Sequence, residues 1–216
     1  MAAAGIAGVI AGVFTLLIVL LPQLYGSPST FEERLAVHGN PWYTLRLWLS
    51  YLNIFAILLA ALGLAAHRFA ASPGLSLTAL LLLVFYGATE LIGRSIMIFT
   101  RENRWVAGLD GADEAERAAL LDAIRIFDQI WVGAFPLILI CFSLSMFLFA
   151  LSLRGGDRLQ QLVRVALFTA AALGLVTLLA PHIVQLRPIA RAGYVLIQPL
   201  SRLLVGLFLL REARRL

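Results

Sequence analysis

Residues 129–152 read QIWVGAFPLILICFSLSMFLFALS, a run of apolar and small side chains without one charged residue. A helix needs about 20 mainly apolar residues to cross the hydrocarbon core of a bilayer. The strands of an outer-membrane barrel would alternate in segments of about 10 residues instead. Because a helix satisfies its own backbone hydrogen bonds in hydrocarbon, this stretch predicts a transmembrane helix.

The same pattern recurs along the chain, at residues 2–21, 44–66, 75–100, 162–181 and 192–210. We therefore predict an all-α polytopic membrane protein, with a bundle of six transmembrane helices in a single domain over residues 1–216. The run at residues 2–21 exceeds the apolar core of about 7–15 residues in a signal peptide, so we expect it to remain as a span. Ala4, Gly8 and Gly12 would let another helix backbone approach it closely.

Composition excludes several classes of protein. With 61% hydrophobic and 13% charged residues, the chain is too apolar for a soluble or a disordered protein. The single Cys141 excludes a disulfide framework. All 17 basic residues are arginine, so chemistry that requires a lysine amine is excluded. The net charge of +5 fits loops beside anionic lipid headgroups, and we expect no nucleic acid partner.

The connections predict an orientation in the membrane. The even-numbered connections and the C-terminal segment are short and rich in arginine, which favours both termini in the cytoplasm. We expect short amphipathic helices on the outer side. Ser29 and Thr30 stand three residues before Glu32 and Glu33, which is the spacing of a capping box.

A second outer helix is expected before the span at residues 129–152. Asp110 is its predicted N-cap, and its apolar face continues into that span. The residues of this face are Leu120, Leu121, Ile124 and Phe127.

Ionisable side chains inside a bilayer cost about 2.5–3.5 kcal/mol on insertion scales, so they are the strongest indication of function. Glu90 lies ten residues before the outer end of its span, or about 15 Å deep. Arg94 follows at i+4 on the same helical face, with Tyr86 one turn below. Arg202 and Asn53 lie at a similar depth in other spans. Three helices thus bring polar groups to one layer.

The inner halves of the first, fourth and fifth spans are almost purely apolar, which predicts a cavity open outward or to the outer leaflet and closed inward. Two arginines against one glutamate favour an anion as the guest. We predict a small anionic or amphiphilic, lipid-like ligand in a transporter-like or sensing module, with the bilayer as its environment. The predicted ligand-binding residues are Asn53, Tyr86, Glu90, Arg94, Asp128, His182 and Arg202.

The sequence also permits other interpretations. The Glu90–Arg94 pair could serve packing alone. Glu90 or Asp128 could act as general acid in a membrane-embedded enzyme of lipid or isoprenoid chemistry. The chain could also form a homo-oligomer or be a structural subunit of a membrane complex. We expect neither a metal nor another cofactor, because the three histidines are far apart and Asp110 and Asp113 suit a helix N-terminus.

The segments YGATELIGR at residues 86–94 and AIRIFDQIW at residues 123–131 carry a resemblance to a known group of proteins. The chain resembles a broad bacterial family of six-span inner-membrane proteins, known only as a domain of unknown function. That family has a glycine-led first span, an ionisable pair in the third span and an acidic approach to the fourth. The resemblance implies the same six-span layout and a location in a bacterial inner membrane, and it brings no activity with it.

Overall fold

The computed structural model describes residues 1–26, 28 and 30–215, apart from the side chain of Arg191. This part of the chain is 87% helical and has no strand. Six helical segments are long and apolar enough to cross a membrane, which confirms the predicted all-α six-helix bundle. They are formed by α1 (Ala2–Leu20) with α2 (Pro22–Tyr25), α4 (Pro41–Phe69), α5 (Pro73–Ser95) with the π-helix η1 (Ile96–Val106), α6 (Glu114–Ser152), α7 (Arg158–Leu179), and the short 3-10 helix η2 (Val184–Leu186) with α8 (Arg187–Ala213).

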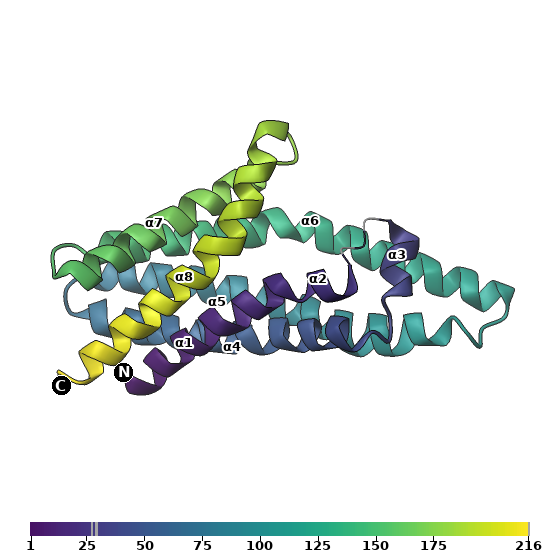
Figure 1. Ribbon diagram of the computed structural model, residues 1–216, viewed down its shortest axis with the longest axis horizontal. Coiled ribbons are helices and arrows are strands. Elements are labelled where there is room, and N and C mark those ends of the chain that lie inside the picture. The colour runs from purple at the N-terminus through teal and green to yellow at the C-terminus, as the bar shows by residue number, and fades with distance from the viewer. Residues whose placement is uncertain (27, 29, 216) are drawn as a thin grey trace.

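Both ends of the chain lie at the same end of the bundle, where purple α1 and yellow α8 run side by side (Figure 1). We call this the terminal end, and the opposite one, which carries α2 and α3 (Phe31–Ala36), the distal end. The connections at 70–72 and 153–157 also lie at the terminal end, as an even number of crossings requires.

Small residues bring α1 and α8 together, as the sequence predicts. A Cβ atom added to Gly8 would lie 2.6 Å from the Cα atom of Gly206. A Cβ atom on Gly12 would overlap Leu203 in the same helix. Ala4 faces a different neighbour, because it packs against Gly63 of α4. The stripe on α1 therefore divides between two partner helices.

The predicted outer helix before the second span is present as α3. Thr30 accepts a hydrogen bond from the backbone N–H of Glu33 at 3.1 Å, and the Glu33 carboxylate accepts one from the backbone N–H of Thr30 at 3.1 Å, which confirms the capping box at this pair. Ser29 lies outside the described residues. Asn40 then caps α4 by accepting from the backbone N–H of Trp42 at 2.9 Å.

The cap predicted at Asp110 is wrong. Asp113 caps α6, accepting from the backbone N–H of Glu116 at 2.8 Å, while Asp110 lies in the preceding turn. The prediction that the outer helix runs into the fourth span is right, since α6 continues unbroken to Ser152. Its 39 residues extend about 58 Å, roughly twice the hydrocarbon thickness of a bilayer.

The excess length of η1 and α6 forms a helical hairpin that projects beyond the bundle at the distal end (Figure 1). Val106, Leu109 and Ile124 are buried in its apolar centre, and Phe31 and Leu35 of α3 pack against them. Helix α3 is therefore fixed against the base of the hairpin, beside the polar groups described next.

A central cavity lined by arginines

A cavity of about 300 Å³ lies within the bundle, between residues of α4, α5, α6, α7 and α8. We call it the central cavity. One part of its wall is apolar, with Phe135, Ile138, Leu139, Phe142 and Leu173. The polar part consists of Arg46, Tyr86, Glu90, Arg94, Thr177, Tyr194, Gln198 and Arg202. Four of the predicted site residues, namely Tyr86, Glu90, Arg94 and Arg202, thus lie around one cavity.

Helix α5 contributes the ion pair of this cavity. Arg94 Nε donates to Glu90 Oε2 at 3.1 Å, and the glutamate is 7% exposed. The Arg94 guanidinium also lies over the ring of Trp131, 5.6 Å from its centroid. A Cβ atom at Gly93 would overlap that ring, so only glycine allows α6 to approach so closely here. The ring of Trp131 therefore packs against one face of the Arg94 guanidinium, while Glu90 accepts a hydrogen bond from its Nε.

Arg202 reaches into the cavity from α8 and has only neutral partners. Its guanidinium donates to the hydroxyl of Thr15 on α1. With the amide of Asn53 turned to satisfy both of its polar atoms, the amide oxygen accepts from Arg202 Nη1 at 2.9 Å and the nitrogen donates to the Ala11 carbonyl at 3.2 Å. Among the described residues, no carboxylate lies within 4.0 Å of Arg202. Asn53 therefore positions Arg202 from behind and does not line the cavity.

Arg46 is a lining residue that the sequence prediction did not include. Its Nε donates to the Ile18 carbonyl at 3.2 Å and its Nη1 donates to the Tyr25 hydroxyl at 3.1 Å. It also has no carboxylate within 4.0 Å in the described part of the chain. The helix boundary was the signal available, because Asn40-Pro41 starts α4 and places Arg46 well inside it.

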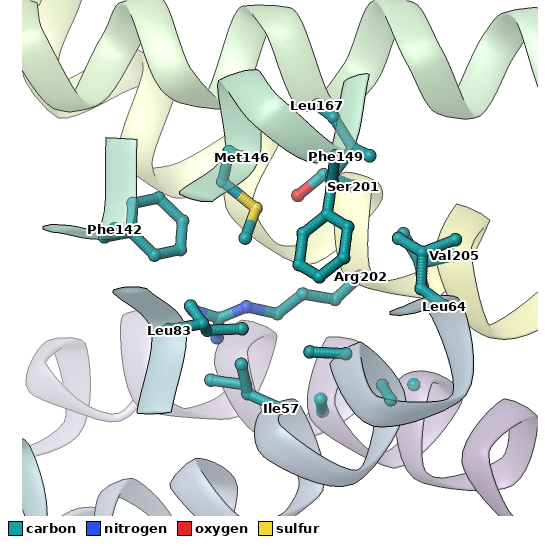
Figure 2. A pocket seen from close by; sticks show the side chains of 14 residues that line it. Ile57, Leu64, Leu83, Phe142, Met146, Phe149, Leu167, Ser201, Arg202 and Val205 are labelled. Carbon is teal, nitrogen blue, oxygen red and sulfur yellow. The ribbon is translucent and has the colours of Figure 1, made fainter. Parts of the chain in front are cut away.

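Beneath the polar wall, the bundle is closed by apolar side chains. A small pocket of about 40 Å³ shares only Phe142 and Arg202 with the central cavity. Figure 2 shows the aliphatic part of Arg202 crossing this pocket among Ile57, Met146 and Phe149. Arg202 also lines the central cavity, so its side chain lies at the boundary between that cavity and the apolar floor.

A second group of buried charges lies at the distal end, where we call it the distal ion cluster. Arg101 and Glu102 of η1 are 3% and 5% exposed. Arg101 donates to the Glu102 carboxylate, and its Nε donates to Asp128 Oδ1 of α6 at 3.2 Å. The Tyr43 hydroxyl donates to Glu102 Oε1 at 3.1 Å, and His38 Nδ1 lies 3.1 Å from Oε2. Each carboxylate and guanidinium of this cluster therefore has a partner.

The π-helical turns of η1 explain how two adjacent residues can both be buried. A π-helix bonds i to i+5, so each residue turns through a smaller angle and neighbouring side chains point more nearly the same way. Arg101 and Glu102 can therefore share one polar cluster between α6 and the start of α4. Such local departures from the α-helix are frequent at functional sites.

The structure places two predicted site residues away from the central cavity. Asp128 belongs to the distal ion cluster, where Arg34 Nε also lies 3.7 Å from its Oδ2. His182 is exposed in the turn after α7 and lines neither the cavity nor the cluster. Both residues lie toward the distal end, but the sequence could not show that α6 carries Asp128 outward and that α7 ends before His182.

Comparison with known proteins gives no further information on this site. No known protein family, characterised protein or solved structure matches this chain. In the described part of the chain, no three His, Cys, Asp or Glu side chains lie close enough together to hold a metal ion. The chemistry of the cavity is that of guanidinium groups whose N–H donors have few acidic partners.

Proposed function

We propose that this multi-pass membrane protein binds an anionic amphiphile in the central cavity and acts as a transporter-like or sensing module. One observation carries the proposal. Three arginines (Arg46, Arg94 and Arg202) line a single cavity of about 300 Å³ together with one carboxylate, Glu90.

Electrostatics favours an anion in this cavity. An unpaired guanidinium in the membrane is costly, and of the three arginines that line the cavity only Arg94 has a described carboxylate within hydrogen-bond distance. Arg46 and Arg202 donate to carbonyl, hydroxyl and amide oxygens, which leave their positive charge uncompensated. An oxyanion between them would supply the missing charge and accept the planar, forked hydrogen bonds that arginine makes best.

The shape and the lining of the cavity favour an amphiphile. Ligand pockets begin at about 300 Å³, and most of their lining is apolar, with a few polar groups that fix orientation. Here the arginines provide the polar part, and Phe135, Leu139 and Leu173 provide the apolar part. A head group at the arginines would leave an acyl or prenyl chain against these side chains.

Thermal unfolding of the purified protein in a non-ionic detergent tests the proposal. Lysophosphatidic acid is the probe, and lysophosphatidylcholine of the same chain length is its control. We expect the anionic lipid alone to raise Tm in the wild type, and Arg202→Gln to abolish the rise. Arg125→Gln, which changes an exposed arginine of α6, should preserve it. Equal stabilisation by both lipids, or an unchanged response in Arg202→Gln, contradicts the proposal.

We also infer that the protein lies in a bacterial inner membrane with both termini in the cytoplasm. The support is the positive charge at the terminal end, which includes Arg154, Arg158, Arg211, Arg214 and Arg215. The resemblance to six-span bacterial membrane proteins agrees with it. Fusion of a reporter that is active only in the cytoplasm to the C-terminus tests the orientation, and an inactive but membrane-inserted fusion rejects it.

A further inference from the structure

A second cavity, of about 330 Å³, lies at the distal end, and we call it the distal vestibule. It is lined by residues of α2, α3, α4, α5, the start of η1 and the connections between α2 and α4. Arg46 and Arg94 line the vestibule and the central cavity alike. The two cavities are therefore neighbours, and these two side chains form the boundary between them.

The charges of the vestibule have the same sign as those of the central cavity. Arg34, Arg46 and Arg94 line it, and none of its lining residues is acidic. Only Arg34 is near a distal carboxylate, that of Asp128 at 3.7 Å. From the distal end inward, the guanidinium groups of Arg34, Arg46 and Arg94 thus lead to Arg202. Field lines concentrate in such clefts and attract ions of the opposite charge.

Between the central cavity and the terminal end, the interior of the bundle is apolar. The floor of the central cavity is the pocket of about 40 Å³ between Phe149, Leu83 and Val205, in which Ser201 and Arg202 are the only polar lining residues among those described. The interior below it is a continuous apolar core, with Phe149 and Phe208 fully buried. Within the bundle, an anion at Arg202 therefore has further guanidinium groups on its distal side and an apolar core on its other side.

We propose that the distal vestibule and the central cavity form one anion-selective path, with Arg46 and Arg94 as its constriction. This inference rests on the proposed function and specifies its route. The oxyanion head group of the amphiphile reaches Arg202 from the distal end by passing between Arg46 and Arg94. Hydrogen bonds to Ile18, Tyr25 and Glu90 hold these two side chains at the boundary.

Cysteine labelling tests the path without knowledge of the ligand. The background is Cys141→Ser, which removes the one native thiol. Thr177→Cys places a thiol in the central cavity. Gly111→Cys and Ala71→Cys place thiols in exposed turns at the distal and the terminal ends, where they report which side a reagent reaches. The reagents are a sulfonate methanethiosulfonate and its trimethylammonium counterpart, added to one side of sealed proteoliposomes.

We expect the thiol at position 177 to react with the anionic reagent from the side on which Gly111→Cys reacts. The cationic reagent should react at least about tenfold more slowly there, relative to the exposed reference thiol. Adding Arg46→Gln should slow the anionic reaction about tenfold while the reaction of Gly111→Cys stays unchanged. The unchanged reference shows that the variant has folded and inserted.

Three outcomes overturn the path. They are no reaction at position 177 from the distal side, reaction from the side marked by Ala71→Cys, and equal rates for the two reagents. Lysophosphatidic acid in detergent remains an independent measurement. Stabilisation without labelling rejects the path alone, whereas labelling without stabilisation rejects the amphiphile and leaves the path supported.

Discussion

The distal ion cluster and the central cavity both contain arginine, but the positive charge is compensated by carboxylates in the cluster and is only partly compensated in the cavity. At the distal end, Arg101 contacts the carboxylates of Glu102 and Asp128. Tyr43 and His38 contact the two carboxylate oxygens of Glu102. In the central cavity, three arginines share one glutamate and an open volume. Charges that are paired with one another serve packing, whereas uncompensated charges beside a cavity indicate a site for a ligand.

The pairing in the distal cluster predicts the largest effect on stability. Arg101→Gln should reduce the free energy of unfolding by about 3–5 kcal/mol, because it leaves buried carboxylates without their cation. Thermal or denaturant unfolding in detergent measures this. Arg125→Gln, at an exposed arginine, should cost less than about 1 kcal/mol. Similar losses in the two variants would remove the contrast between the cluster and the surface.

Arg202 is expected to behave in the opposite way. Arg202→Met keeps an apolar side chain in the pocket below the central cavity and removes an uncompensated charge. The free energy of unfolding of the ligand-free protein should therefore rise by up to about 3 kcal/mol. The same variant should lose its stabilisation by lysophosphatidic acid. A variant that is both less stable and still responsive to the lipid would assign Arg202 to the scaffold.

Glu90 limits the positive charge of the cavity. Glu90→Gln removes the carboxylate that Arg94 contacts at 3.1 Å, so the guanidinium becomes free for a bound anion. We expect the affinity for lysophosphatidic acid to rise about tenfold, or about 1.4 kcal/mol, in a titration of detergent-solubilised protein. Glu114→Gln, at an exposed position of α6, is the control. A weaker affinity in Glu90→Gln would show that the carboxylate contacts the ligand itself.

The terminal end provides the smallest effect. Asp157 accepts from the backbone N–H of Gln160 at 3.1 Å and from Arg211 at 2.7 Å, and these contacts hold the pKa of its carboxyl below its ordinary value. The stabilisation is therefore complete above the ordinary aspartate pKa, about 3.9, and is lost as the pH falls through the lowered value. Asp157→Asn should flatten the acid limb of the stability profile, and an unchanged limb would show that the contact contributes nothing.

The sequence predicted the fold well because the apolar length of each span and the polarity of its ends are local properties. The six spans, the glycine contacts of α1 and the Thr30–Glu33 cap all follow from neighbouring residues. The helix ends were less accurate where charged residues continue a helix beyond the membrane. Arg101 and Glu102 look like a loop in sequence, although η1 carries them into a buried cluster.

The candidate site was predicted only in part, because the sequence gives the position of a residue along its helix but not the neighbours of that helix. The depths of Glu90, Arg94 and Arg202 follow from counting along a helix, and these residues do line one cavity. Counting along helices cannot show which spans are neighbours, so it could not indicate that Thr15 and Asn53 support Arg202. It also could not show that Asp128 faces Arg101 or that His182 faces outward. Their role as ligand-binding residues remains a prediction.

The contact between Arg94 and Trp131 allows ligand binding to be followed by the intrinsic fluorescence of the tryptophan. The indole lies against Gly93 and under the guanidinium, so its emission depends on the field of that cation. An anion that draws Arg94 toward the cavity would change this fluorescence without any attached dye. Among the described residues, Trp131 is the one tryptophan of the four with an arginine over its ring, so the difference in emission between the wild type and Trp131→Phe gives its signal.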